Sequence, residues 1–193
     1  MCAEGGFFMS KNKKDFFGLG NIRNLKVIST LALLAAISIV LGKFLAINIS
    51  ESIRLSFENL TIILSGILFG PIAGMITGIV SDSLGCLLYG YALNPVITLG
   101  AVTIGFLSGI LYKILSNINV TLNISITVAI SHLIGSVIVK TIGLCIWYDM
   151  PFFITLGWRS INYLMVGTAE FVLITILMRN NGFKSQINRL IGG

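Results

Sequence analysis

The sequence predicts an all-α integral membrane protein whose six transmembrane helices form one bundle. Of its 193 residues, 55% are hydrophobic, and the mean hydropathy is +0.97. Only 10% are charged, where a soluble domain carries about 25%. So few charged side chains cannot cover a surface that faces water, and long stretches of the chain carry no charge at all. We therefore expect most of the surface to face lipid.

Three prolines divide the apolar sequence into helices. Proline is best tolerated in the first turn of a helix and breaks a helix interior, so Pro71, Pro95 and Pro151 each mark the start of a new helix. The expected segments are residues 27–48, 58–69, 71–89, 95–115, 121–147 and 151–178.

The first two segments differ in length, and only the first is long enough to span a bilayer. The apolar run over 27–49 is longer than the core of a signal peptide and can span a bilayer, which needs about 20 residues. The segment 58–69 would rise only ~18 Å and is too short to cross alone. We expect it to pair tightly with the third segment or to be unusually tilted.

Positive charge gathers near the two ends of the chain. With the N-terminus inside, the cytoplasmic segments hold nine of the 13 Lys and Arg residues: Lys11, Lys13, Lys14, Arg23, Lys26, Lys113, Arg179, Lys184 and Arg189. By the positive-inside rule both termini are expected in the cytoplasm, which requires an even number of crossings. The organisation expected is a basic N-terminal segment (1–26), a membrane domain (27–178) and a basic cytoplasmic tail (179–193), multi-pass in a bacterial cell membrane.

Ionisable residues inside apolar sequence are costly and mark candidate functional sites. They are Arg54, Glu58, Asp82, His132, Lys140, Arg159 and Glu170. Under the six-helix topology several lie near the outer ends of helices together with aromatic residues, among them Phe57, Tyr89, Tyr91, Trp147, Tyr148, Phe152, Phe153 and Trp158. An interfacial aromatic belt with snorkelling cations would explain this pattern. A pocket for an anionic, flat, partly aromatic solute would explain it too.

Two intramembrane side chains leave alternatives open. Asp82 lies well inside the third segment, so it needs either an intramolecular partner, such as Lys140 or a hydroxyl, or paired N–H donors from a heterocyclic ligand. His132 has no second His, Cys or acid at metal-ligand spacing, which favours a packed, hydrogen-bonded histidine and predicts no metal site.

Missing motifs narrow the function. The chain has no GxxxxGK[ST], HExxH or GxSxG sequence, so an ATPase or a hydrolase is disfavoured. A small intramembrane enzyme or scaffold that uses Ser131, His132 or Glu170 stays open as an alternative. Ala32 and Ala36 are small residues four apart on the first helix, where either bundle packing or a partner helix would use them.

The stretch from Ile53 to Leu88 resembles the second and third helices of the substrate-binding (S) components of energy-coupling factor (ECF) vitamin transporters, and it is most similar to the folate type. The matching motifs are Arg54-Leu55-Ser56-Phe57, Phe69-Gly70-Pro71, Asp82 with Leu84-Gly85, Trp147, Pro151, Arg159 and the Ala32/Ala36 pair. Glu58 and Gly157-Trp158 depart from the family pattern and could reshape the outer pocket. An S component for another vitamin or precursor is therefore the alternative.

The resemblance implies a mechanism and partners. Such bundles capture a vitamin from outside, with the loop between the first two helices as a gate. They work with a membrane coupling subunit and two cytoplasmic ATPases, and the Ala32/Ala36 pair would face the coupling subunit. Folate is the expected bound substrate, with no cofactor and no nucleic-acid partner.

The resemblance also implies roles for single residues. Asp82 would accept hydrogen bonds from the amino-pyrimidine edge of the pterin. Trp147, Phe57 or Tyr89 would stack on its rings. Arg54 and Arg159, together with Lys140, would hold the glutamate carboxylates or the pterin carbonyl.

Overall fold

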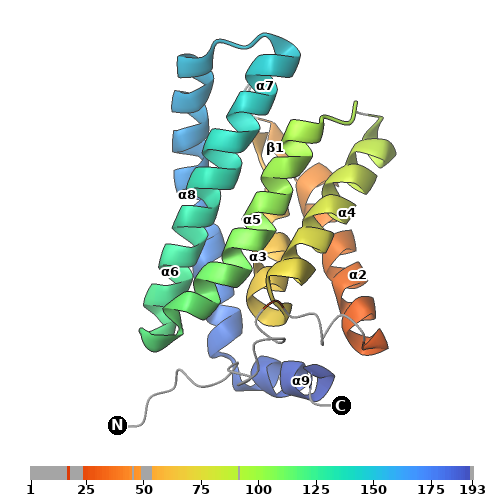
Figure 1. The fold of residues 1–193 in the computed structure, drawn as a ribbon, viewed down its shortest axis with the longest axis vertical. Helices are drawn as coiled ribbons and strands as arrows, with labels where there is room; N and C mark the ends of the chain where they lie inside the picture. Colours follow the sequence, from red (N-terminus) through yellow and green to blue (C-terminus); the bar gives the residue numbers. More distant parts are fainter. Residues whose placement is uncertain (1–16, 18–23, 45, 49–53, 91, 192–193) are drawn as a thin grey trace.

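The computed structural model describes residues 17, 24–44, 46–48, 54–90 and 92–191, and within them the chain is a bundle of helices with one short hairpin (Figure 1). The helices are α2 (Leu25–Ile39), α3 (Glu58–Phe69), α4 (Pro71–Tyr89), α5 (Pro95–Ile114), α6 (Val120–Ser131), α7 (Lys140–Tyr148), α8 (Phe152–Arg179) and α9 (Asn181–Ile191). Two π-helical stretches, η3 (Val40–Phe44) and η5 (His132–Val139), continue α2 and join α6 to α7, and a 3-10 turn, η4 (Leu115–Asn117), follows α5. The strands β1 (Ile47–Asn48) and β2 (Arg54–Leu55) pair antiparallel between η3 and α3.

The expected fold class is confirmed. Five helical stretches within the described residues are long and apolar enough to cross a membrane: Leu25–Lys43, Pro71–Tyr89, Pro95–Asn117, Val120–Tyr148 and Phe152–Arg179. Their limits lie within a few residues of those predicted. The prolines act as expected, because α4 and α5 begin on Pro71 and Pro95, and α8 begins directly after Pro151.

The short helix α3 is the centre of this part of the bundle. It is 12 residues long, and every one of them except Leu60 is buried. It packs against α2, α4 and α5 rather than against α4 alone. Because other helices cover it, α3 does not have to present a lipid-facing surface of full bilayer length. Burial by neighbouring helices therefore explains how so short a helix fits in the bundle. The sequence had suggested tight pairing with the third segment or an unusual tilt instead.

Small residues let α3, α4 and α5 approach closely. A Cβ added at Gly74 would clash with the carbonyl group of Gly105, and one added at Gly105 would clash with that of Gly74. A Cβ at Gly66 would meet the Ser108 hydroxyl and the Gly105 carbonyl. The glycines spaced four apart therefore serve packing within the bundle, as small residues do in membrane helix interfaces.

The connection between α3 and α4 is tight because of Gly70. Its φ is 105°, a conformation that side-chain-bearing residues rarely adopt. Its N–H still donates to the Gly66 carbonyl at 3.0 Å, which ends α3, and Pro71 begins α4 at the next residue. The reversal places the C-terminal half of α4 beside the start of α3.

The C-terminal tail contains a helix that the sequence did not predict. Residues 181–191 form α9, which lies across one end of the bundle (Figure 1). Ile187 is buried, and Phe183 and Leu190 pack on the same core cluster, a spacing that puts all three on one helix face. The Asn24 side chain donates to the Leu190 carbonyl at 3.1 Å and ties α9 to the start of α2.

We expect Gly105→Ala to destabilise the protein by about 1–3 kcal/mol, because the new methyl group overpacks the α4–α5 contact. Gly157→Ala is the matched control, since a Cβ there meets nothing within 4 Å. Thermal unfolding of both variants in detergent measures the difference. Equal melting temperatures for the two would contradict the close-packing argument.

Candidate functional site

A charged cavity of about 230 Å³ lies toward the end of the bundle opposite α9. Its ionisable lining residues other than tyrosine and cysteine are Lys43, Glu58, Asp82, Lys140 and Arg159. Its other polar or aromatic lining residues are Ser56, Asn94, Tyr148, Trp158, Asn162 and Tyr163. These side chains come from η3, the start of α3, α4, the start of α5, α7 and α8, so the site is assembled from segments that are far apart in sequence.

The Arg159 guanidinium is held in place by α8 and η5. Its Nε and Nη2 donate to the Ser136 carbonyl at 3.1 and 2.9 Å, and Nη2 also donates to the Tyr163 hydroxyl at 3.2 Å. The guanidinium also lies over the Tyr163 ring, 5.2 Å from its centroid. An arginine carries five N–H donors, so both N–H groups of Nη1 remain for a ligand.

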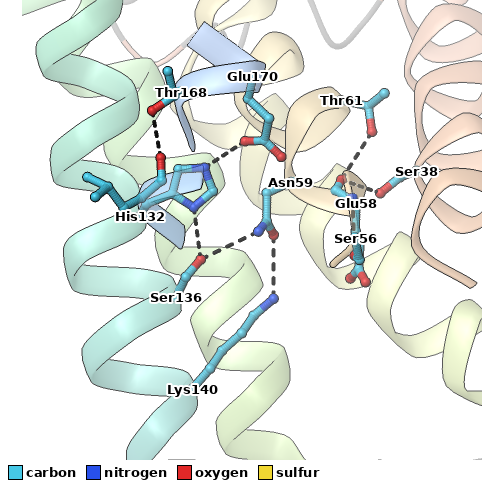
Figure 2. A network of polar contacts seen from close by, with 11 residues as sticks. Ser38, Ser56, Glu58, Asn59, Thr61, His132, Ser136, Lys140, Thr168 and Glu170 are labelled. Carbon is cyan, nitrogen blue, oxygen red and sulfur yellow. Dashed lines mark hydrogen bonds and ion pairs between the residues drawn. The ribbon is translucent and has the colours of Figure 1, made fainter. Parts of the chain in front are cut away.

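Lys140 is buried at the first turn of α7. Its Nζ donates to Asn59 Oδ1 at 3.4 Å, and Asn59 Nδ2 in turn reaches Ser136 Oγ at 3.5 Å (Figure 2). An ammonium group has three donors, and only this long hydrogen bond is made to a described residue. A buried lysine with spare donors is suited to an anionic or carbonyl group of a ligand.

Asp82 has the hydroxyl partner that one of the two alternatives for its sequence position required. It is buried in α4, and its Oδ2 accepts a 2.6 Å hydrogen bond from the Thr98 hydroxyl of α5. Asp82 also lines the cavity, and no hydrogen bond from a described residue reaches Oδ1. One oxygen is thus fixed by the protein, and the carboxylate keeps acceptor capacity toward the cavity.

The structure places the remaining expected site residues in different ways. Trp147 lies outside the cavity lining, whereas the adjacent Tyr148, which is equally exposed at 50%, is part of it, since successive helical residues point about 100° apart. Tyr89 is also outside the lining and donates its hydroxyl to the Lys43 carbonyl at 2.7 Å. Phe57 is half-buried beside the lining rather than in it. The side chain of Arg54 lies outside the described residues.

Several lining residues were not predicted. Lys43 has a recognisable signal in the sequence, since it is an ionisable residue at the end of an apolar run, but it is not among the expected site residues. Asn94 caps α5 through Oδ1, which accepts from Val96 N at 3.0 Å, while its Nδ2 donates to the Gly143 carbonyl at 3.2 Å. Asn162 and Tyr163 lie three and four residues after Arg159, one turn further along the same helix face.

His132 and Glu170 form a buried pair deeper in the bundle (Figure 2). His132 Nε2 lies 2.6 Å from Glu170 Oε2, and Nδ1 lies 3.1 Å from Ser136 Oγ. The Tyr163 ring stacks on the imidazole with centroids 5.3 Å apart. This is the packed, hydrogen-bonded histidine that the sequence favoured. Through Ser136 and Asn59 the pair is linked to Lys140.

A second, larger hollow of about 390 Å³ runs between α6, η5 and α8. It is lined mostly by small and apolar side chains, with the His132 and Tyr163 rings as its main polar features. None of its lining residues is Lys, Arg, Asp or Glu. Ligand sites need a few convergent polar groups as well as apolar walls, so the charged cavity is the candidate site.

No group of three or more His, Cys, Asp or Glu within the described residues is placed to hold a metal ion.

A family comparison decides what kind of protein presents this cavity. Residues 26–185, which cover all but the first residue of the five candidate membrane spans found among the described residues, match the family described as "ECF transporter, substrate-specific component". The chain belongs to this family. It is therefore an S component, a substrate-binding membrane subunit of a transporter rather than an enzyme, and the alternative reading of Ser131, His132 and Glu170 as an active site is set aside.

Solved structures share the fold of this S component. FolT bound with folic acid superposes with a TM-score of 0.64 and 21% identity, over 79% of this chain and 92% of FolT. A bacterial ECF transporter S component gives a TM-score of 0.61 and 20% identity over 80% and 94% of the two chains. The S component for biotin of an ECF-type ABC transporter gives 0.62 and 20% over 92% and 98%. At these identities the likeness establishes the fold.

A curated relative matches only part of the S component. The "Uncharacterized protein MG098 homolog" of Mycoplasma pneumoniae is 30% identical over 115 residues. This match covers 56% of the chain and 24% of the relative, so the chain spans about a quarter of that protein.

We expect Glu170→Leu to lower the free energy of unfolding by about 1–3 kcal/mol, because it leaves Nε2 of the buried His132 without its hydrogen-bond partner. Thr168→Ala is the control on the same helix, since Thr168 is exposed and donates only to the Leu164 carbonyl of its own turn. Thermal melting of the two purified variants compares them. If Glu170→Leu melted like the wild type, the pair would not be a structural element.

Proposed function

We propose that this S component captures a folate-type vitamin on the outer side of the cell membrane. The observation that carries the proposal is the joint placement of a buried carboxylate, Asp82, with the partly unsatisfied cations Lys140 and Arg159 around one cavity. A pterin offers an amino-pyrimidine edge of N–H donors, and folate adds carbonyl and carboxylate acceptors. FolT bound with folic acid supports the same choice, because its fold covers most of this chain.

The proposed roles follow from the free hydrogen-bonding capacity of each group. Asp82 accepts hydrogen bonds from the amino-pyrimidine edge through the acceptor sites of its carboxylate that Thr98 does not occupy. Lys140 and the Nη1 group of Arg159 bind the pterin carbonyl or the glutamate carboxylates, with Arg54 contributing from the hairpin. Tyr148 and Trp158 line the cavity and supply aromatic faces for stacking, in place of Trp147, Phe57 and Tyr89, which lie outside the lining.

The proposed orientation puts the cavity at the outer face. The positive-inside rule places both termini in the cytoplasm, which assigns the α9 end of the bundle to the inside (Figure 1). The hairpin β1–β2 and the start of α5 are then at the opposite, outer end. The hairpin links the first two membrane helices, where a gate over the cavity is expected.

Transport requires partners that hydrolyse ATP, and we propose a membrane coupling subunit with two cytoplasmic ATPases. The structure leaves Ala32 and Ala36 exposed on α2, beside the exposed apolar residues Leu33 and Ile37. Small residues on an exposed helix face allow a second helix to approach closely. We propose this face of α2 as the contact with the coupling subunit.

A second vitamin class remains a candidate function. The S component for biotin has a similar TM-score and covers more of this chain than FolT does. Glu58 adds a carboxylate to the cavity lining that the folate-type pattern does not contain. Mass spectrometry of the small molecule released from purified protein separates these candidates.

We expect Asp82→Asn to weaken folate binding by about 1.5–3 kcal/mol, the range for a hydrogen bond to a charged group. Isothermal titration calorimetry of the purified protein measures it. Asp149→Asn is the control, because Asp149 is exposed, lies outside the cavity lining and has φ 50°, which asparagine tolerates. Unchanged folate affinity in Asp82→Asn would remove Asp82 from the site.

We expect Ala32→Trp and Ala36→Trp to abolish vitamin uptake by cells while purified protein binds the vitamin normally. The indole would hold the partner helix away from α2. Leu164→Trp is the control, because Leu164 is 73% exposed on α8, away from the alanine pair. Normal uptake by both alanine variants would refute the proposed interface.

A further inference from the structure

Glu58 is a buried carboxylate in the lining of the cavity. It is 9% exposed and lines the cavity, yet its carboxylate makes no hydrogen bond or ion pair with any described residue. Its Oε1 is fully covered and unsatisfied. The cations Lys43, Lys140 and Arg159 line the same cavity and offset part of the charge of Glu58. A buried carboxylate oxygen without a hydrogen bond still costs free energy, which a ligand N–H would recover.

The backbone and side chain of Glu58 are held in place. Its carbonyl accepts from the Ser38 hydroxyl of α2 at 2.8 Å and from Thr61 at 3.4 Å, and its N–H donates to Ser56 Oγ at 3.4 Å (Figure 2). The side chain packs against Gly42 of η3, where an added Cβ would lie 2.8 Å from Glu58 Oε2 and 2.9 Å from its Cβ. A glycine at position 42 thus makes room for this side chain.

The cavity therefore has two carboxylates with acceptor capacity for a ligand. Asp82 on α4 and Glu58 at the start of α3 face the same space, and three cations, Lys43, Lys140 and Arg159, complete its charged lining. An oxidised pterin presents the paired N–H donors of its amino-pyrimidine edge, which one carboxylate satisfies. Its pyrazine nitrogens are acceptors, which a second carboxylate would repel. In a tetrahydropterin both of these nitrogens carry hydrogen and become donors.

We propose that Glu58 is a specificity-determining residue that accepts a hydrogen bond from a ring N–H of a reduced pterin, so that the S component selects reduced over oxidised folates. This inference rests on the proposed folate function and specifies its substrate class. Asp82 binds the amino-pyrimidine edge, which is the same in both redox forms. Glu58 contacts the pyrazine ring, whose nitrogens differ between the two forms.

The test compares two ligands on three proteins. Folic acid and tetrahydrofolate, the latter kept under anaerobic reducing conditions, are titrated calorimetrically into the full chain as wild type, Glu58→Gln and Asp82→Asn. We expect the wild type to bind tetrahydrofolate about 10-fold or more tightly than folic acid, since one hydrogen bond to a charged group separates them. Glu58→Gln should lose most of this ratio. Asp82→Asn should weaken both ligands and keep the ratio.

Two results would overturn the inference in distinguishable ways. Equal affinities in the wild type, or the same ratio in Glu58→Gln, would remove Glu58 as the discriminator and leave folate binding intact. Failure of the wild type to bind either ligand would overturn the proposed folate function and the inference with it. If Glu58→Gln did not fold, Gly42→Ala would replace it, because the added methyl displaces the Glu58 carboxylate and should likewise reduce the ratio.

Discussion

The close approach of α4 and α5 at Gly74 and Gly105 is the constraint on which the site depends. The helix α3 packs against both of them and against α2, and all of its residues except Leu60 are buried. That placement brings the first turn of α3, with Glu58 and Asn59, to the inside of the bundle at the level of Asp82. A larger residue at either glycine would separate the helices that carry these groups.

Charge inside an apolar bundle has to be held by the protein, and this requirement links the cavity to the deeper core. Arg159 donates to the Ser136 carbonyl in η5. Lys140 donates to Asn59 of α3, whose amide in turn reaches the Ser136 hydroxyl, so both cations are linked to Ser136. Ser136 also bonds His132, whose other nitrogen meets Glu170. The buried pair thus fixes the Ser136 hydroxyl, which also contacts Asn59, the partner of Lys140, so its contribution to ligand binding is indirect.

The sequence predicted most of the fold because prolines, charge distribution and apolar length act locally. Helix limits around Pro71 and Pro95 follow from the missing N–H of proline alone. It could not predict that Tyr148 faces the cavity while Trp147 does not, since this depends on the rotation of α7 against its neighbours. The helix α9 was not predicted for a related reason. Three apolar residues in a basic tail stabilise a helix only when a core is there to cover them.

The π-helical stretch η5 makes this part of the bundle tolerant of a change in chain length. A π-helical turn accommodates one residue more than an α-helical turn, while the helix on either side keeps its direction. Loss of one residue from His132–Val139 would therefore return this turn to regular geometry and leave Lys140 on the face that meets Asn59. A deletion within the regular part of α7 would instead turn the side chains that follow it by about 100° and exchange those that a ligand meets.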